Sequence, residues 1–150
     1  MLQYKVKSDK IINLFKTEIN QLNSGNMKFD LIDYNDESLS LRCHLHIISL
    51  KFKQEGEMVN VIISFTFEGG GGEAGGLAQN FSSVGGDRAA CRIVEFINEK
   101  LDTSEITESA TQYLLEKQSN VKQGYSNMAI WAVGFVALFF IIYFITMSSL

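Results

Sequence analysis

The C-terminal apolar run constrains the structure of this chain more than any other feature. Residues 128–147 include no charged side chain. As a helix, this segment of 20 residues would extend by roughly 30 Å, the thickness of the hydrocarbon core of a bilayer. Eleven of its residues are Leu, Ile, Val or Phe, and together they favour insertion by about 3 to 7 kcal/mol. We therefore predict one transmembrane helix over 128–147, followed by a short tail at 148–150.

The side chains of the predicted span are mostly large and apolar all around the helix. A buried helix of a soluble protein rarely runs so long without a polar face, and this segment has none. Trp131 and Tyr143 lie near its two ends, where aromatic rings favour the water interface. The predicted anchor residues are Met128, Ile130, Trp131, Val133, Phe135, Val136, Leu138, Phe139, Phe140, Ile141, Ile142, Tyr143, Phe144 and Ile145.

The charges that flank the span predict its orientation. Lys117 and Lys122 precede it, and only uncharged residues follow it. Because basic residues remain on the cytoplasmic side, we expect the N-terminal domain to be cytoplasmic. The N-terminus also lacks the apolar run of a secretory signal. The expected topology is that of a single-pass, tail-anchored protein, in the endoplasmic reticulum, the mitochondrion or another membrane.

The charge balance of the chain argues against a nucleic-acid partner. There are 13 basic and 17 acidic residues, which give a net charge of -4. A protein that neutralises phosphates normally carries a basic excess. The two cysteines, Cys43 and Cys91, belong to no ligand cluster, so we expect reduced, packed thiols. No cofactor is expected.

Alternation of apolar and polar residues predicts a small antiparallel sheet. Three segments show the period of two that is typical of half-buried strands, and they cover residues 29–31, 39–47 and 59–67. A turn at 54–56 is expected before the last segment. The economical arrangement is an antiparallel meander of three to four strands.

Two helices are predicted to pack against this sheet. The first is an amphipathic helix with an N-cap at Ser8 or Asp9, and Gly25 ends it. The second follows Asp87, which can cap it, and reaches Leu101. The fold class is therefore α+β, with an N-terminal helix, a following helix and one C-terminal transmembrane helix.

The glycine-rich stretch at 69–86 contains eight of the 12 glycines. Glycine has the most backbone entropy to lose on ordering, so we predict a long flexible loop. A P-loop is not indicated, because no Lys followed by Ser or Thr closes the run. The predicted domain organisation is a soluble α+β domain over 1–120, a juxtamembrane linker over 121–127 and the membrane helix.

Candidate reactive residues form no complete site in the sequence. His44 and His46 would share one strand face, but two histidines without a further ligand are an incomplete metal site. Cys43 and His44 would project to opposite faces, so they cannot act as nucleophile and base. The acidic residues around the first strand are expected to be solvated, namely Asp30, Asp33, Asp36 and Glu37. No catalytic, cofactor-binding or metal-binding residue is predicted.

These features together predict a non-enzymatic, single-pass membrane protein. An accessory subunit or adaptor typically combines a membrane anchor with a small packed domain that has no set of catalytic residues. Its expected partners are the lipid bilayer and other subunits of a membrane-bound complex. The alternative is a lipid-recognition module tethered to its own membrane.

Overall fold

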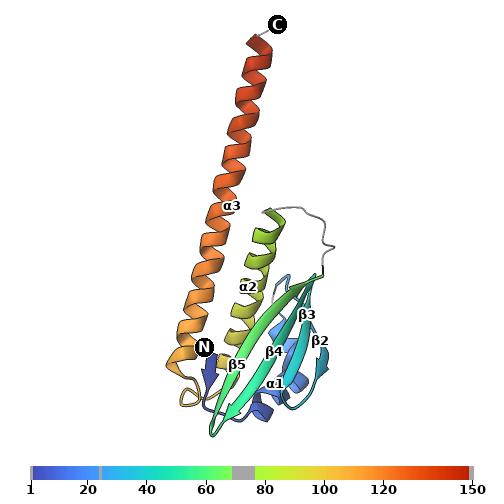
Figure 1. Cartoon of the computed structure of the whole chain (residues 1–150), viewed down its shortest axis with the longest axis vertical. Helices are drawn as coiled ribbons and strands as arrows, with labels where there is room; N and C mark the ends of the chain where they lie inside the picture. Colours follow the sequence, from blue (N-terminus) through green and yellow to red (C-terminus); the bar gives the residue numbers. More distant parts are fainter. Residues whose placement is uncertain (1, 24, 69–76, 149–150) are drawn as a thin grey trace.

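In the computed structural model, residues 2–23, 25–68 and 77–148 are described, and they form an α+β domain from which one long helix projects (Figure 1). The sheet and its covering helices correspond to the predicted fold class. In chain order the elements are β1 (Leu2–Tyr4), α1 (Ser8–Leu22), β2 (Phe29–Tyr34), β3 (Ser38–Cys43), β4 (His46–Glu55), β5 (Met58–Phe67), α2 (Leu77–Lys100) and α3 (Glu108–Ser148).

The five strands form one antiparallel sheet in the order β1-β5-β4-β3-β2. Strands β2 to β5 form a meander, which confirms the predicted antiparallel arrangement. Strand β1 pairs with the other edge of β5, with Leu2 opposite Val61. The predicted number of three to four strands was too low, because β1 and a separate β4 were not foreseen.

The β3–β4 turn explains why one predicted strand, 39–47, is two strands. Cys43 pairs with His46, so only His44 and Leu45 form the turn. In sequence, Leu45 and Ile47 continue the apolar alternation of β3. In the structure, however, Leu45 lies in the turn. Ile47 lies on one face of β4, and the core residue Ile48 lies on the opposite face. The phase of the alternation therefore changes at the turn, which a pattern read along the chain cannot reveal.

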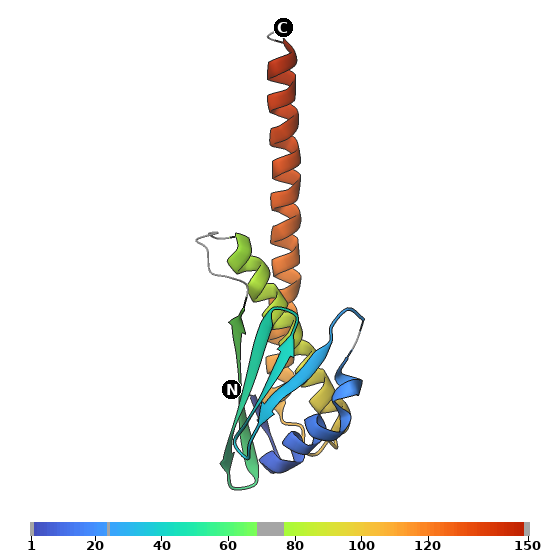
Figure 2. The same ribbon diagram turned by 90° about the vertical axis from the view of Figure 1, so that its right-hand side faces the viewer.

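The helices α1 and α2 lie on one face of the sheet, and the core lies between these two layers (Figure 2). Phe15 of α1 and Phe96 of α2 pack with their ring centroids 5.3 Å apart. Arg92 of α2 donates hydrogen bonds to the carbonyls of Gln21 and Leu22, at 2.9 and 3.0 Å. This guanidinium satisfies carbonyls that the last turn of α1 leaves without an intrahelical partner.

The N-terminus of α1 forms a hydrogen bond with a strand as well as one within its own first turn, where the Lys10 amide donates to the Asp9 carboxylate at 2.8 Å. Lys7 is the N-cap residue and makes no side-chain capping bond, so the predicted cap at Ser8 or Asp9 is wrong. Instead, the Ser8 amide donates to the side-chain oxygen of Gln54 on β4, at 2.9 Å. The Ser8 amide, one of the donors that the first turn leaves without an intrahelical partner, is therefore satisfied by a residue far along the chain.

More than half of the predicted glycine-rich loop, residues 77–86, is helical. Helix α2 begins at Leu77, so the prediction of a loop is wrong for 77–86, and Asp87 lies inside the helix rather than at its cap. Residues 69–76 of the predicted loop lie outside the described part of the chain. Within α2, Gly86 faces the Phe65 ring, and a Cβ placed there would lie 3.2 Å from Cγ of that ring. The glycine allows α2 to approach β5 closely.

The segment between α2 and α3 closes the β1 edge of the sheet. The Asp102 amide donates to the Glu105 carboxylate at 3.0 Å, and the Glu105 amide donates to the Asp102 carbonyl at 2.8 Å, so these residues form a turn ahead of α3. Lys5 donates its amide to the Glu105 carbonyl, and Tyr4 forms a bridge with Ile106. This edge strand is therefore covered by the chain itself.

Candidate functional site in the C-terminal helix and its contact with the domain

Helix α3 is continuous from Glu108 to Ser148, and its second half stands clear of the domain (Figure 1). Its most apolar 18-residue window has a mean hydropathy of 2.6 and is 0% buried. The helix is long and apolar enough to cross a membrane. All the large apolar side chains predicted as anchor residues from Ile130 to Ile145 are exposed, and Met128 is half-buried. The residues predicted as a linker, 121–127, belong to the same unbroken helix.

The first half of α3 packs on α2 along a regular seam. The less exposed residues recur at alternating spacings of four and three, at Ala110, Leu114, Lys117, Val121, Gly124 and Met128. This is the spacing of two helices that pack with a small crossing angle. At Gly124 the helices come so close that an added Cβ would lie 2.2 Å from Cγ2 of Val84. The absence of a side chain at Gly124 therefore permits the contact.

Polar contacts accompany this seam. Lys117 donates to the Asp87 carboxylate at 2.7 Å, and both side chains are less than one-fifth exposed. Burial lowers the pKa of Lys117, but the hydrogen bond to Asp87 and nearby negative charges raise it more, so the net pKa lies above its ordinary value. Arg88 of α2 donates to the Tyr125 hydroxyl at 3.4 Å. This seam was not predicted, although the four-three spacing of less exposed positions from Ala110 to Met128 is typical of a helix that packs on another.

The prediction that the two histidines share one strand face is wrong. His44 is exposed in the β3–β4 turn, where its φ of 54° lies in the left-handed region. His46 begins β4, and its ring packs against Phe67 with a centroid distance of 5.4 Å. The turn separates the two imidazoles, because it removes His44 from the strand that would have aligned them.

The cysteines are free and buried, as predicted. Burial raises the pKa of the Cys43 thiol, and the Asp30 carboxylate also raises it, whereas Arg88 lowers it. Burial likewise raises the pKa of Cys91 to about 11. Although His46 is the cross-strand neighbour of Cys43, a thiol that stays protonated is a poor nucleophile. The geometry supports packing rather than thiol chemistry.

The predicted acidic cluster lies on exposed positions of β2 and the β2–β3 turn. Asp30, Asp33, Asp36 and Glu37 are all exposed. The Asp33 carboxylate accepts a hydrogen bond from the Tyr34 amide at 2.8 Å, and the amide of Glu37 donates to the Asn35 side chain at 2.9 Å. These contacts organise the turn and fit the expected solvated role.

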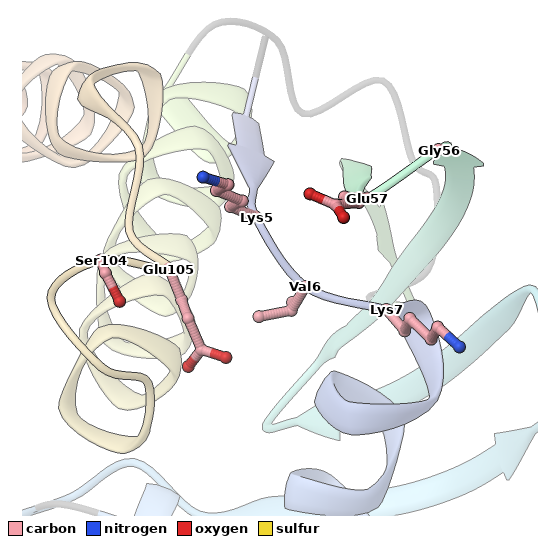
Figure 3. Close-up of a pocket in the computed structure, with 7 residues that line it drawn as sticks. All are labelled: Lys5, Val6, Lys7, Gly56, Glu57, Ser104 and Glu105. Carbon is pink, nitrogen blue, oxygen red and sulfur yellow. The ribbon is translucent and has the colours of Figure 1, made fainter.

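A shallow open depression of about 350 Å³ lies beside the β4–β5 turn, with Lys5, Glu57, Ser104 and Glu105 around it (Figure 3). The Glu105 carboxylate is held by Lys10 at 2.5 and 2.7 Å. This bond, followed by the one from the Asp102 amide, lowers the pKa of Glu105. The Glu105 carboxylate therefore links the 102–107 segment to α1 through Lys10.

The β2 edge of the sheet differs from the covered β1 edge. In the described part of the chain, β2 pairs only with β3, so its other side is open. A register shift between Leu31 and Asp33 bulges this strand. Ile32 and Tyr34 beside the bulge are 46% and 47% exposed. An open edge with exposed apolar side chains is a surface on which another chain can pair.

The described part of the chain holds no candidate metal site. Among residues 2–23, 25–68 and 77–148, no group of three or more His, Cys, Asp or Glu could hold a metal ion. The features that stand out are the exposed apolar half of α3, its seam with α2 and the open β2 edge. Comparison of the chain with protein-family models, with curated proteins and with solved structures finds no match.

Proposed function

We propose that this protein is anchored in a membrane by residues 128–147 of α3. The observation that carries the proposal is the uninterrupted exposure of large apolar side chains on this half of the helix. In water these side chains would form an apolar surface far larger than soluble monomers carry. In a bilayer they are matched by lipid, and the continuous helix satisfies its backbone hydrogen bonds internally.

The orientation follows from the basic groups on the domain side of the span. Lys117 and Lys122 lie on α3 on the domain side of the span, and Lys122 is exposed. Positive flanks remain cytoplasmic, so the α+β domain faces the cytoplasm.

Anchorage is tested by alkaline carbonate extraction of membranes that contain the full chain. We expect the full chain to stay with the membranes, and a variant that lacks 128–150 to be released. Protease added outside sealed, cytoplasm-facing vesicles should digest the domain. Release of the full chain by carbonate would refute the anchor, and protection of the domain from protease would refute the orientation.

Within that membrane, we propose a non-enzymatic role as an accessory subunit or adaptor. Support comes from the β2 edge, which pairs with no second strand in the described part of the chain and where Ile32 and Tyr34 are about half exposed. Addition of a strand to such an edge supplies main-chain hydrogen bonds, and flanking side chains supply specificity. The raised thiol pKa values of Cys43 and Cys91 suit packed side chains rather than nucleophiles.

The adaptor role is tested by the size of the native particle in mild detergent. We expect the full chain to migrate within a discrete assembly, and the Tyr34→Lys variant to migrate as a smaller particle while it remains anchored. Glu57→Lys is the matched control, since it places the same side chain on an exposed turn at another edge of the domain. A monomeric full chain, or equal loss of the assembly in both variants, would contradict the proposed edge.

A further inference from the structure

The α2–α3 seam continues up to the start of the proposed span. Gly124 contacts Val84, and Met128, the first residue of the span, is still half-buried. The helix passes from the domain into the span without a break. The position of the domain relative to the bilayer is therefore set by helix geometry and not by a flexible tether.

The contact of Val84 with Gly124 also sets how far α2 extends along α3 towards the proposed span. The two helices run in opposite directions (Figure 1), as the contacts Val84 with Gly124 and Glu95 with Gln118 require. Each residue of an α-helix advances by about 1.5 Å, so four residues correspond to about 6 Å. Counted from the Val84–Gly124 contact towards the span, Asn80 of α2 and Met128 of α3 lie at the same level. Helix α2 continues three residues further, to Leu77.

The headgroup region on each side of a bilayer is about 5 to 7 Å thick. The backbone of α2 from Val84 to Asn80 covers about this distance on the domain side of Met128. We propose that α2 from Val84 to Asn80 lies within the headgroup layer of the membrane that holds α3, and that its first residues, 77–79, reach the boundary of the hydrocarbon core. This inference rests on the proposed anchor, and its ligand is the lipid headgroup layer itself.

The charges next to this end of the domain suit such a contact. Arg88 lies one helical turn below Val84 on α2, and Lys122 lies half a turn before Gly124 on α3; both are exposed. Basic residues near an anionic membrane surface are attracted by about 1 kcal/mol each. The contact would hold the sheet and its open β2 edge in one orientation above the bilayer.

The depth of α2 can be measured with single tryptophans in the full chain. Trp131 is the native tryptophan, and Trp131→Phe provides a background without it. Asn80→Trp in this background places an indole at the proposed depth. Glu57→Trp places one in the exposed β4–β5 turn, at the end of β4 opposite to the β3–β4 turn. Each protein is reconstituted in phosphatidylcholine and phosphatidylserine vesicles that carry a nitroxide on the lipid headgroup.

We expect the headgroup nitroxide to remove most of the emission of Asn80→Trp and to leave that of Glu57→Trp unchanged. Insertion of a flexible Gly-Ser segment between Asn127 and Met128 should abolish the quenching of Asn80→Trp. If Asn80→Trp disturbs the fold, as judged by circular dichroism, Ala78→Trp replaces it. Equal quenching of the α2 and β4–β5 positions, or quenching that survives the insertion, would overturn the inference.

The native Trp131 separates this inference from the anchor on which it rests. A nitroxide on the lipid acyl chain should quench Trp131 in the unmodified chain. If Trp131 is quenched but Asn80→Trp is not, the anchor stands and the contact of α2 with the headgroups is wrong. If Trp131 is not quenched, the proposed anchor itself fails.

Discussion

Replacement of Gly124 by alanine tests whether close packing of α2 and α3 depends on this glycine. The added Cβ would lie 2.2 Å from Cγ2 of Val84, whereas carbon atoms in contact are about 3.5 to 4.0 Å apart. Val84 cannot easily turn away, because a valine on a helix has one strongly preferred rotamer. Overpacking of this kind costs about 1 to 3 kcal/mol.

Helix propensity acts in the opposite direction and must be separated from the clash. Alanine is favoured over glycine in a helix by about 1 kcal/mol. We therefore expect Gly124→Ala to lower the free energy of unfolding by about 0 to 2 kcal/mol in the native sequence. In a Val84→Ala background the clashing methyl is absent, so the same change should raise the free energy of unfolding by about 1 kcal/mol. The expected coupling between the two sites is thus about 1 to 3 kcal/mol.

The assay is chemical denaturation of the full chain in detergent micelles, and unfolding is monitored by circular dichroism. Gly134→Ala is the matched control, because it makes the same change in the same helix and nothing lies within 4 Å of its added Cβ. This control should not lower the stability of the domain. If Gly124→Ala has the same effect with valine and with alanine at position 84, the seam is not closely packed there and the reasoning is wrong.

Three further changes test individual contacts in the domain by the same denaturation assay. The Tyr4 hydroxyl is buried and has no hydrogen-bond partner among the described residues, so Tyr4→Phe should raise the free energy of unfolding by about 1 kcal/mol. Burial raises the pKa of Tyr4 above its ordinary value of 10.0, so the unfolded chain loses the phenol proton at a lower pH than the native protein does. The free energy of unfolding should therefore fall as the pH rises above 10.0, and it should fall less in Tyr4→Phe. Asp87→Ala leaves the Lys117 ammonium half-buried without its carboxylate and should cost about 1 to 3 kcal/mol, and an unchanged unfolding midpoint would contradict a structural role for this pair. His44 has a positive φ that glycine adopts freely, so His44→Gly should stabilise the fold by about 1 kcal/mol, and destabilisation would show that the imidazole makes a contact that outweighs the strain.

Local patterns determined much of the fold. The 3.6-residue stripe of α1, the alternation of β5 and the apolar run of α3 each depend on residues close in sequence, so their periodicity could be recognised without tertiary information. The sequence pattern is clearest in elements that bury one full face, such as α1 and β5, and in the uncharged apolar run of α3.

The features that were missed depend on contacts between distant segments. Strand β1 has only three residues, too short for a periodic signal, and it exists because β5 and the 105–107 segment pair with its two edges. The turn at His44 reverses the alternation by pairing β3 with β4, and a turn with positive φ at histidine is not signalled by its residue type.

The glycines show most clearly what sequence and tertiary structure each decide. Glycine permits both a flexible loop and a close approach of two backbones, because both follow from the absence of a Cβ. The sequence alone determined that residues 128–147 are uncharged, apolar and long enough to span a bilayer, since that depends only on composition and helical rise. Only the tertiary structure decided that Gly86 and Gly124 lie inside helices, against Phe65 and Val84, because the partner that fills the space beside a missing side chain is far away in the chain.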